Sequence, residues 1–274
     1  MGYESFYLLK YEPFSNHPDP KFYFNSPQHA LARGYLLHAA KGKRGLALLL
    51  GELGTGKTTL SRRVLGELSI EGKYQVGLLV LTHSDFSPVW FLQKIAFLLG
   101  IGEPKDDIHT LFSQITDRLM GINKEEKHAV IIIDEANKLT SAECAEELRG
   151  LLNLELAGGK LITFILSGLP PLNDFLLQNP ALYQRVVVRV ILKPLDPTTV
   201  KAYIQHRLSV AGRKEELFTD KALNLIAQYS KGRPRLVNAI CDNALFEGYM
   251  ERKPIIDEFI IERVAENLVL KKTE

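Results

Sequence analysis

Residues 51–59 read GELGTGKTT and fit the spacing G-x-x-x-x-G-K-[ST]. Glycines let a backbone wrap closely around phosphate oxygens with its N–H groups pointing inward. The amine of Lys57 would reach the β- and γ-phosphates of ATP, and the hydroxyl of Thr58 would ligate Mg²⁺. The stretch therefore predicts a phosphate-binding loop. The residues expected to contact the nucleotide are Gly51, Glu52, Gly54, Thr55, Gly56, Lys57, Thr58 and Thr59.

Residues 131–136, IIIDEA, place two carboxylates directly after an apolar run. Asp134 would hold the magnesium ion, usually through its water shell. Glu135 would orient and deprotonate the attacking water; the alternative is that Glu135 only caps the next helix. A protein that merely held a nucleotide would not need the second acid, so the pair indicates ATP hydrolysis.

Five short apolar, β-branched runs alternate along the chain with longer helical patterns. They are apolar almost throughout, as strands are when helices cover both faces of a parallel sheet. This alternation predicts an α/β fold with a five-stranded, mostly parallel sheet flanked by helices. The expected strands lie at 45–50, 76–82, 129–134, 161–167 and 186–192, and the expected helices at 58–70, 86–100, 107–120, 141–156 and 171–179.

After Leu192 the strand-like runs stop and only helical patterns follow. Asp196 and Pro197 are typical of a helix start, and Gly212 of the position beyond a helix end. Further helices are expected at 219–230, 234–250 and 256–268. We therefore predict an α/β domain at 1–193, which includes an N-terminal segment at 1–44, and a helical domain at 194–274.

The chain has 274 residues, of which 46% are hydrophobic, enough for a substantial core. Its net charge of +2 neither favours nor excludes nucleic acid, because a local basic patch can lie within a near-neutral total. Cys144 and Cys241 lack the spacing of a zinc site or a disulfide framework, which is typical of a reducing cytoplasm. No apolar run approaches the roughly 18–20 residues that span a bilayer, so we expect a cytoplasmic protein without direct membrane insertion.

The phosphate loop and the acid pair resemble those of AAA+ ATPases, and other stretches resemble the ExeA/GspA family. The latter stretches are LKYEPFSNHPDPKFYFNSPQHALA, LRGLLNLE, LKPLDPTTVKAYIQHRLSVAG and GRPRLVNAICDNAL. That family comprises bacterial ATPases tied to general secretion and type IV pilus assembly. The resemblance implies a P-loop AAA+ core followed by a small all-helical lid. It also implies a protein partner from a secretion or pilus machinery, which could hold the chain at the inner membrane.

The resemblance implies three further site residues. Ser167 ends the fourth expected strand, where these ATPases carry a sensor of the γ-phosphate or the attacking water; the alternative is a simple turn former. Arg185 precedes the fifth strand, where an arginine finger acts on a neighbouring subunit, which makes the protein a homo-oligomer. Arg189 is a rival for that role. Arg235 in GRPR matches the sensor arginine of the lid, with Arg233 as the alternative.

Two weaker interpretations concern residues around the expected site. Thr82 or His83, which end the second expected strand, would hold Glu135 in check until a partner binds, or have only a structural role. The aromatic residues near the start, Phe14, Phe22 and Tyr23, would pack against adenine or lie in the core.

A second functional class stays open, because related AAA+ ATPases assemble on DNA and recruit a transposase. Such assembly needs Lys and Arg on backbone phosphates and depends strongly on salt. The available basic clusters are KGKR at 41–44, Arg62 with Arg63, and KGRPR at 231–235. For each cluster the favoured interpretation is an ordinary one, as solvated surface or as a nucleotide contact. The sequence alone thus favours secretion or pilus assembly and keeps DNA transposition as the alternative.

Overall fold

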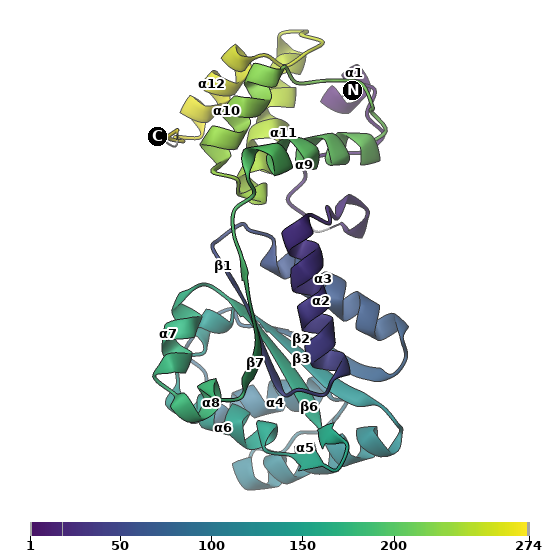
Figure 1. Ribbon diagram of the computed structural model, residues 1–274, viewed down its shortest axis with the longest axis vertical. Helices are drawn as coiled ribbons and strands as arrows, with labels where there is room; N and C mark the ends of the chain where they lie inside the picture. The colour runs from purple at the N-terminus through teal and green to yellow at the C-terminus, as the bar shows by residue number, and fades with distance from the viewer. Residues whose placement is uncertain (1, 18, 273–274) are drawn as a thin grey trace. The chain divides into compact units, whose positions relative to one another are not determined.

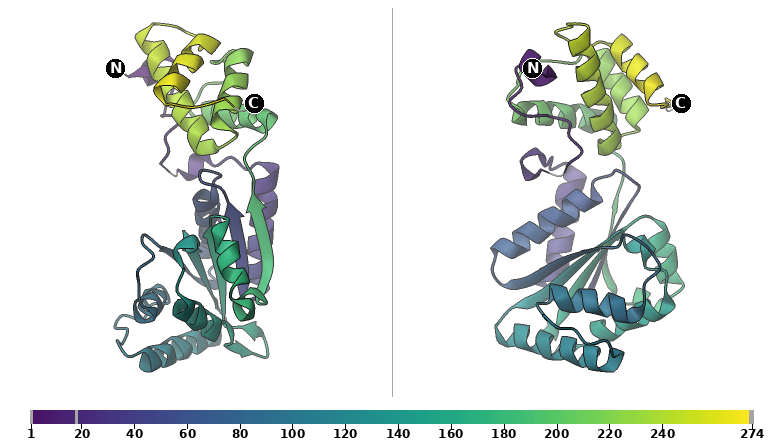
Figure 2. Two further views of the ribbon diagram at one scale, coloured as in Figure 1. Left: turned by 90° about the vertical axis from the view of Figure 1, so that its left-hand side faces the viewer. Right: turned by 180° about the vertical axis from the view of Figure 1, so that it is seen from behind.

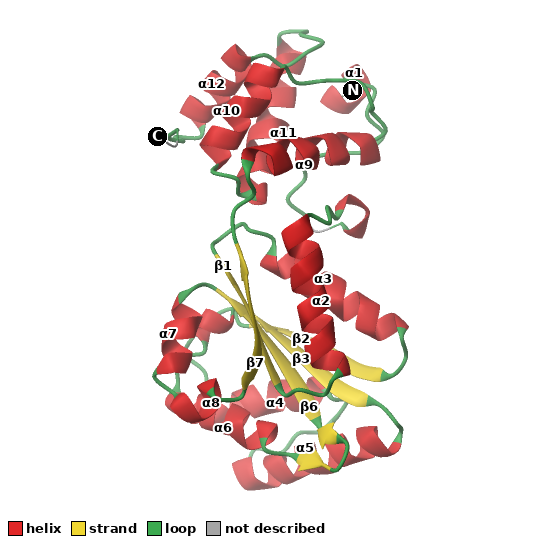
Figure 3. Ribbon diagram, in the orientation of Figure 1, coloured by secondary structure: helices red, strands yellow, loops and turns green. Residues whose placement is uncertain are grey.

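The computed structural model describes residues 2–17 and 19–272. The chain divides into two compact units. The α/β unit consists of Pro27–Glu52 and Lys57–Leu192, and the helical unit of Met1–Ser26, Leu53–Gly56 and Lys193–Glu274. All named strands belong to the α/β unit, as the yellow arrows in Figure 3 show.

Five strands form one parallel sheet in the order β2-β3-β6-β1-β7. Their bounds are β1 (Leu46–Gly51), β2 (Tyr74–Val80), β3 (His128–Asp134), β6 (Ile162–Gly168) and β7 (Val186–Leu192). Each expected strand is present, so the predicted five-stranded sheet is confirmed. The small antiparallel hairpin of β4 (Glu155–Leu156) and β5 (Gly159–Lys160) is an addition that the sequence did not predict.

Helices cover both faces of the sheet (Figures 1 and 2). One face packs against α2 (Pro27–Lys41) and α3 (Lys57–Ile70). The other face packs against α4 (Pro88–Leu98), α5 (Ile108–Lys124), α6 (Ala142–Leu152), α7 (Pro171–Leu177) and α8 (Pro180–Tyr183). Three of these helices start at polar caps, where Ser87, Asp107 and Ser141 each accept a backbone N–H from three residues onward.

Strand β3, which has a neighbouring strand on each side, explains why the expected strands read as continuous apolar runs. Ile131 and Ile133 face the core under α4–α6, while Val130 and Ile132 face the core under α2 and α3. Every residue of β3 is buried. Because parallel strands all end at the same edge of a sheet, β3 carries Asp134 to the edge where β1 ends at Gly51.

The helical unit contains the C-terminal helices and the first 26 residues. Its elements are α1 (Tyr3–Phe6), η1 (Pro20–Phe22), α9 (Pro197–Val210), α10 (Asp220–Ser230), α11 (Pro234–Met250) and α12 (Glu258–Asn267). The expected helical domain is therefore joined by a segment that the sequence assigned to the α/β domain. Within the predicted N-terminal segment 1–44, residues 27–44 lie in the α/β unit, and most of them form α2.

Arg207 of α9 shows why the first residues pack there. Its buried guanidinium donates to the carbonyl of Pro13, to the carbonyl of Ser15 at 3.1 Å and to the hydroxyl of Tyr203 at 2.7 Å. It also lies over the ring of Phe22, 4.9 Å from the centroid. A buried cation needs partners for its N–H groups, and the N-terminal segment supplies two carbonyls and an aromatic face.

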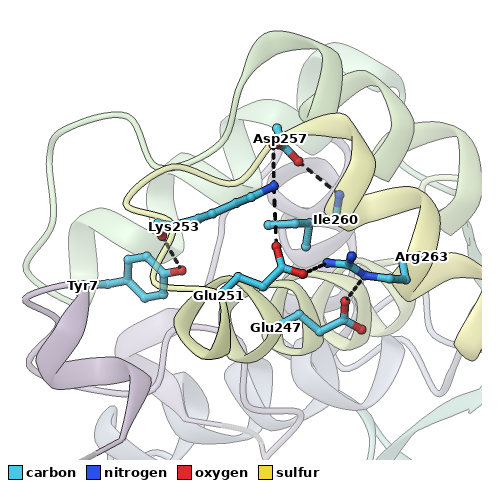
Figure 4. Close-up of polar contacts among 7 residues, drawn as sticks. All are labelled: Tyr7, Glu247, Glu251, Lys253, Asp257, Ile260 and Arg263. Atoms are coloured by element: carbon cyan, nitrogen blue, oxygen red, sulfur yellow. Dashed lines mark hydrogen bonds and ion pairs between the residues drawn. The ribbon is translucent and has the colours of Figure 1, made fainter.

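A second set of contacts holds the loop between α11 and α12 (Figure 4). Lys253 donates to Asp257 at 2.9 Å, and the carbonyl of Lys253 accepts from the hydroxyl of Tyr7 at 3.0 Å. Arg263 of α12 bridges Glu247 of α11 and Glu251, the residue directly after α11. A Cβ atom at Gly248 would lie 2.4 Å from the Tyr7 hydroxyl, so only glycine lets Tyr7 approach α11 this closely.

His128 is a buried histidine at the start of β3. Its Nε2 lies 2.8 Å from the hydroxyl oxygen of Thr163 on β6. Burial lowers the pKa of His128 to about 4, and the positive charge of Lys43 acts in the same direction. The folded protein therefore binds a proton at the His128 imidazole less readily than the unfolded chain does, since the imidazole of an unfolded chain titrates near pH 6.5.

We expect the free energy of unfolding to fall as the pH drops from about 6.5 towards about 4, because the unfolded state then binds the extra proton. His128 alone would account for about 2–3 kcal/mol between about pH 7 and pH 4.5. Urea unfolding at both pH values checks this in the parent and in His128→Gln, which should lose that part of the dependence. His109→Gln, at an exposed position, is the control. An unchanged pH dependence in His128→Gln would contradict the prediction.

Candidate active site

The predicted phosphate loop joins the end of β1 to the start of α3. Gly54 and Gly56 have φ values of +79° and +98°, a left-handed conformation that is open to glycine at little cost. Helix α3 begins at Lys57, so its first N–H groups and the positive end of its dipole lie at the end of the loop. Strand, glycine-containing loop and helix thus follow one another as an anion-binding loop requires.

Lys57 lies inside the turn of this loop. Its ammonium group donates to the carbonyls of Gly51 at 2.8 Å and Glu52 at 2.9 Å, and the side chain is only 8% exposed. Burial lowers the pKa of Lys57, while the carboxylates of Glu135 and Asp134 act in the opposite direction. A desolvated cation held by two weak acceptors is well suited to bind phosphate oxygens, because the anion supplies the charge that it lacks.

Asp134 is the centre of the polar site at the sheet edge. One carboxylate oxygen accepts from the hydroxyl of Thr58 at 2.6 Å, and the other from the hydroxyl of Ser167 at 2.7 Å. Asp134 is 2% exposed and Ser167 is fully buried. A hydroxyl and a carboxylate side by side are hard oxygen ligands of the kind that Mg²⁺ takes together with water. The residues present therefore fit a magnesium ion bound with a nucleotide.

Ser167 is the last residue but one of β6, at the place where the resemblance implied a sensor. Because β6 lies between β3 and β1, the side chain of Ser167 lies next to Asp134. In this arrangement Ser167 orients the carboxylate expected to hold magnesium.

Glu135 follows Asp134 at the end of β3 and has a left-handed backbone, with φ 55° and ψ 33°. Such a conformation is uncommon for a residue with a side chain, and it occurs disproportionately at functional sites. Among the described residues no hydrogen bond engages the Glu135 carboxylate. Glu135 does not cap η2 (Ala136–Lys138) with its side chain, which removes the simplest structural explanation for this acid.

The residues proposed to restrain Glu135 have other contacts. The carbonyl of Thr82 accepts from the ammonium group of Lys138 at 2.8 Å. The ring of His83 lies against Trp90, with centroids 5.6 Å apart. Within the described part of the chain, neither residue forms a hydrogen bond with Glu135.

The arginine expected to act as a finger lies at the other end of its own sheet. Arg185 directly precedes β7, and β7 runs parallel to β1, which begins beside Val186 and ends beside Leu192. The Arg185 guanidinium donates to the carbonyl of Ala181 and to the side chain of Asn153. The rival Arg189 is exposed in the middle of β7. In its own subunit Arg185 is therefore remote from Asp134.

Arg233 and Arg235 stand at the start of α11. Arg233 is its N-cap residue and Arg235 follows Pro234. The backbone N–H of Arg235 donates to the carbonyl of Gly54 at 3.4 Å, both within the helical unit. A Cβ atom added to Gly54 would lie 3.1 Å from the Cβ of Arg235 and 3.9 Å from that of Arg233, so both arginines lie close to this glycine.

The early aromatic residues belong to the core of the helical unit. Phe14 is 1% and Phe22 is 8% exposed, and the Phe14 ring contacts that of Phe218. Of the two explanations that the sequence left open for these two residues, core packing is the one observed. Tyr23 is partly buried.

Comparisons with known proteins agree with the nucleotide-binding geometry described above. A family model described as an AAA domain matches residues 40–176, which hold the phosphate loop, the acid pair and most of the sheet. The chain belongs to the AAA-domain family. Over 250 residues it is 36% identical to General secretion pathway protein A of Aeromonas hydrophila, which confirms the resemblance to the ExeA/GspA family. The match covers 90% of this chain and 45% of that protein, so the chain spans about half of its relative's length.

Solved structures share the fold at low sequence identity. The ORC2 protein of Aeropyrum pernix, solved as ADPNP-ADP complexes, superposes with a TM-score of 0.69 at 19% identity, over 93% of this chain and 71% of that one. Drosophila ORC bound to DNA gives 0.70 at 15% identity, over 95% and 65%. At these identities the likeness establishes the AAA+ fold alone. None of the described helices combines the length and the apolar character needed to span a membrane.

Proposed function

We propose that this chain binds ATP with Mg²⁺ and hydrolyses it as a homo-oligomer, and that hydrolysis drives the assembly of a secretion or type IV pilus complex. The observation that carries the proposal is the arrangement of Lys57, Thr58 and Asp134 where β1 and β3 end. Lys57 donates to the carbonyls of the phosphate loop, and Thr58 donates to the Asp134 carboxylate. The AAA-domain family supports nucleotide hydrolysis, and the curated relative supports secretion.

In the proposed reaction the backbone amides between Gly51 and Thr59 bind the phosphates, and Lys57 binds the β- and γ-phosphate oxygens. Thr58 and Asp134 would hold Mg²⁺, which supplies positive charge to the β- and γ-phosphate oxygens. Ser167 keeps the Asp134 carboxylate in one orientation. The nucleotide contacts at Glu52, Gly54 and Thr55 remain a prediction on the same loop.

Glu135 takes a proton from water as the water oxygen bonds to the γ-phosphorus and the bond from that phosphorus to the bridging oxygen breaks. ADP leaves with the electron pair of that bond, and phosphate carries the new oxygen. Lys57, Arg235 and a neighbouring subunit's Arg185 would stabilise the negative charge that develops on the phosphoryl oxygens.

The proposed site of action is the cytoplasm. A protein partner would hold the chain at the inner membrane. Loss of the γ-phosphate would change the fit between subunits, which is how hydrolysis would drive assembly. DNA remains a different partner class. The relative named for general secretion favours a protein partner over DNA. The net charge of +2 does not decide between the two.

Lys57→Ala is expected to weaken ATP binding more than tenfold, since hydrogen bonds to charged groups contribute about 1.5–3 kcal/mol each. Calorimetric titration of ATP with Mg²⁺, and release of phosphate, measure binding and turnover in the parent and the variant. Lys124→Ala, at an exposed position on α5, is the matched control. Parent-like binding in Lys57→Ala would remove the phosphate-loop assignment. Adding duplex DNA to the parent tests the partner class, because salt-dependent stimulation would favour DNA.

A further inference from the structure

The short turn after the acid pair is tied to both strands that neighbour β3. Element η2 (Ala136–Lys138) begins directly after Glu135. In the sheet order β3 has β2 on one side and β6 on the other. A side chain of η2 reaches the end of each of these strands.

Asn137 makes the tie to β6. Its side-chain oxygen accepts the backbone N–H of Leu169 at 3.0 Å, just beyond the end of β6 at Gly168. The approach is close, because a Cβ atom added to Gly168 would lie 3.0 Å from the backbone nitrogen of Asn137 and 3.1 Å from its side-chain oxygen. Glycine at 168 therefore allows the strand end and the turn to touch.

Lys138 makes the tie to β2. Its ammonium group donates to the carbonyl of Thr82 at 2.8 Å. The backbone continues the pairing on the same side, since the N–H of Leu81 donates to the carbonyl of Asp134 at 3.1 Å. The two side chains therefore form a crossbar, here meaning Asn137 and Lys138 with their contacts to Leu169 and Thr82.

The crossbar begins at Asn137, two residues after Glu135, whose backbone needs support from its surroundings. Glu135 has φ 55°, a conformation that side chains rarely adopt and that persists only where surrounding contacts enforce it. The carbonyl of Glu135 accepts the N–H of Lys138 at 3.0 Å, so the turn closes directly onto the strained residue. Movement of the turn would therefore move the Glu135 carboxylate.

We propose that Asn137 and Lys138 are positioning residues for ATP hydrolysis, which hold the backbone of Glu135 and thereby its carboxylate at the end of β3. This inference rests on the proposed function, in which Glu135 accepts the proton from water. In this proposal both residues act through Glu135, and the nucleotide is bound by the phosphate loop. Their loss should therefore lower kcat and leave the affinity for ATP unchanged.

Asn137→Ala removes the acceptor, and Asn137→Asp keeps an acceptor oxygen at the same distance along the side chain. We expect kcat to fall roughly ten- to hundredfold in Asn137→Ala, as for a catalytic group displaced by about 1 Å, and to recover largely in Asn137→Asp. KM and the dissociation constant for ATP should equal those of the parent in both. Lys138→Met, which removes the donor to Thr82, should lower kcat in the same way.

The full chain is used throughout, with phosphate release for kcat and KM, titration of ATP for binding, and thermal unfolding to confirm folding. Asn243→Ala, an exposed asparagine on α11, is the matched control. A parent-like kcat in Asn137→Ala and Lys138→Met would overturn the positioning role while leaving hydrolysis intact. Equal loss in Asn137→Ala and Asn137→Asp, or a rise in KM at constant kcat, would also overturn it. If the parent itself turned over no ATP, the proposed function would fail, and the inference with it.

Discussion

Glu135→Gln is expected to lower ATP turnover by roughly 10²–10⁴-fold, the usual contribution of a positioned general base. Glutamine has nearly the same size but cannot accept the proton from water. Lys57, Thr58 and Asp134 are untouched by the change, so ATP binding should remain at the level of the parent. The trapped ATP state should also favour a larger assembly.

Single-turnover phosphate release, ATP titration and sedimentation with ATP measure these three quantities. Glu103→Gln, an exposed glutamate, is the control for the loss of one negative charge. Turnover at the rate of the parent in Glu135→Gln would place the base elsewhere. Loss of ATP binding together with turnover would instead mean that Glu135 belongs to the binding site.

The left-handed backbone at Glu135 is a feature that the sequence could not reveal. IIIDEA shows two acids after an apolar run, which suffices to place Asp134 at a strand end. It does not show that the chain turns through φ 55° at the second acid. Likewise, Asn137 and Lys138 read as ordinary turn residues, because their partners Thr82 and Leu169 are defined only by the sheet.

The strands were predictable because burial on both faces leaves a nearly continuous apolar signal. The order of the strands was not, since nothing local in β6 says that it lies between β3 and β1. That order brings Ser167 to Asp134, and so determines which hydroxyl orients the carboxylate.

The N-terminal boundary escaped prediction for a related reason. Tyr7 and Phe14 read as apolar residues that any core could bury. Their place is decided by contacts almost a whole chain away, such as the Tyr7 hydroxyl on the carbonyl of Lys253 and Arg207 on the carbonyl of Pro13. Patterns within a window of a few residues carry no information about such pairs.

Arg185→Ala is expected to reduce turnover by about 10³-fold or more, the range for a finger that stabilises transition-state charge. ATP binding should persist, because Arg185 lies at the opposite end of its own sheet from Asp134. The ties to Asn153 and the Ala181 carbonyl hold the side chain at the start of β7. In the proposed mechanism Arg185 would act from there on a neighbouring subunit's nucleotide. Arg189→Ala separates the two candidates, since the residue that is the finger should show the larger loss.

Mixing Arg185→Ala with Lys57→Ala tests whether the finger acts between subunits. The first variant keeps a working phosphate loop, and the second keeps a working finger. In a one-to-one random mixture about a quarter of the sites pair an intact loop with an intact finger, so about that share of parent turnover should return. Neither variant alone should show it. A mixture as inactive as its components would mean that Arg185 acts within its own subunit through a large rearrangement, or that it stabilises the start of β7 and takes no part in hydrolysis.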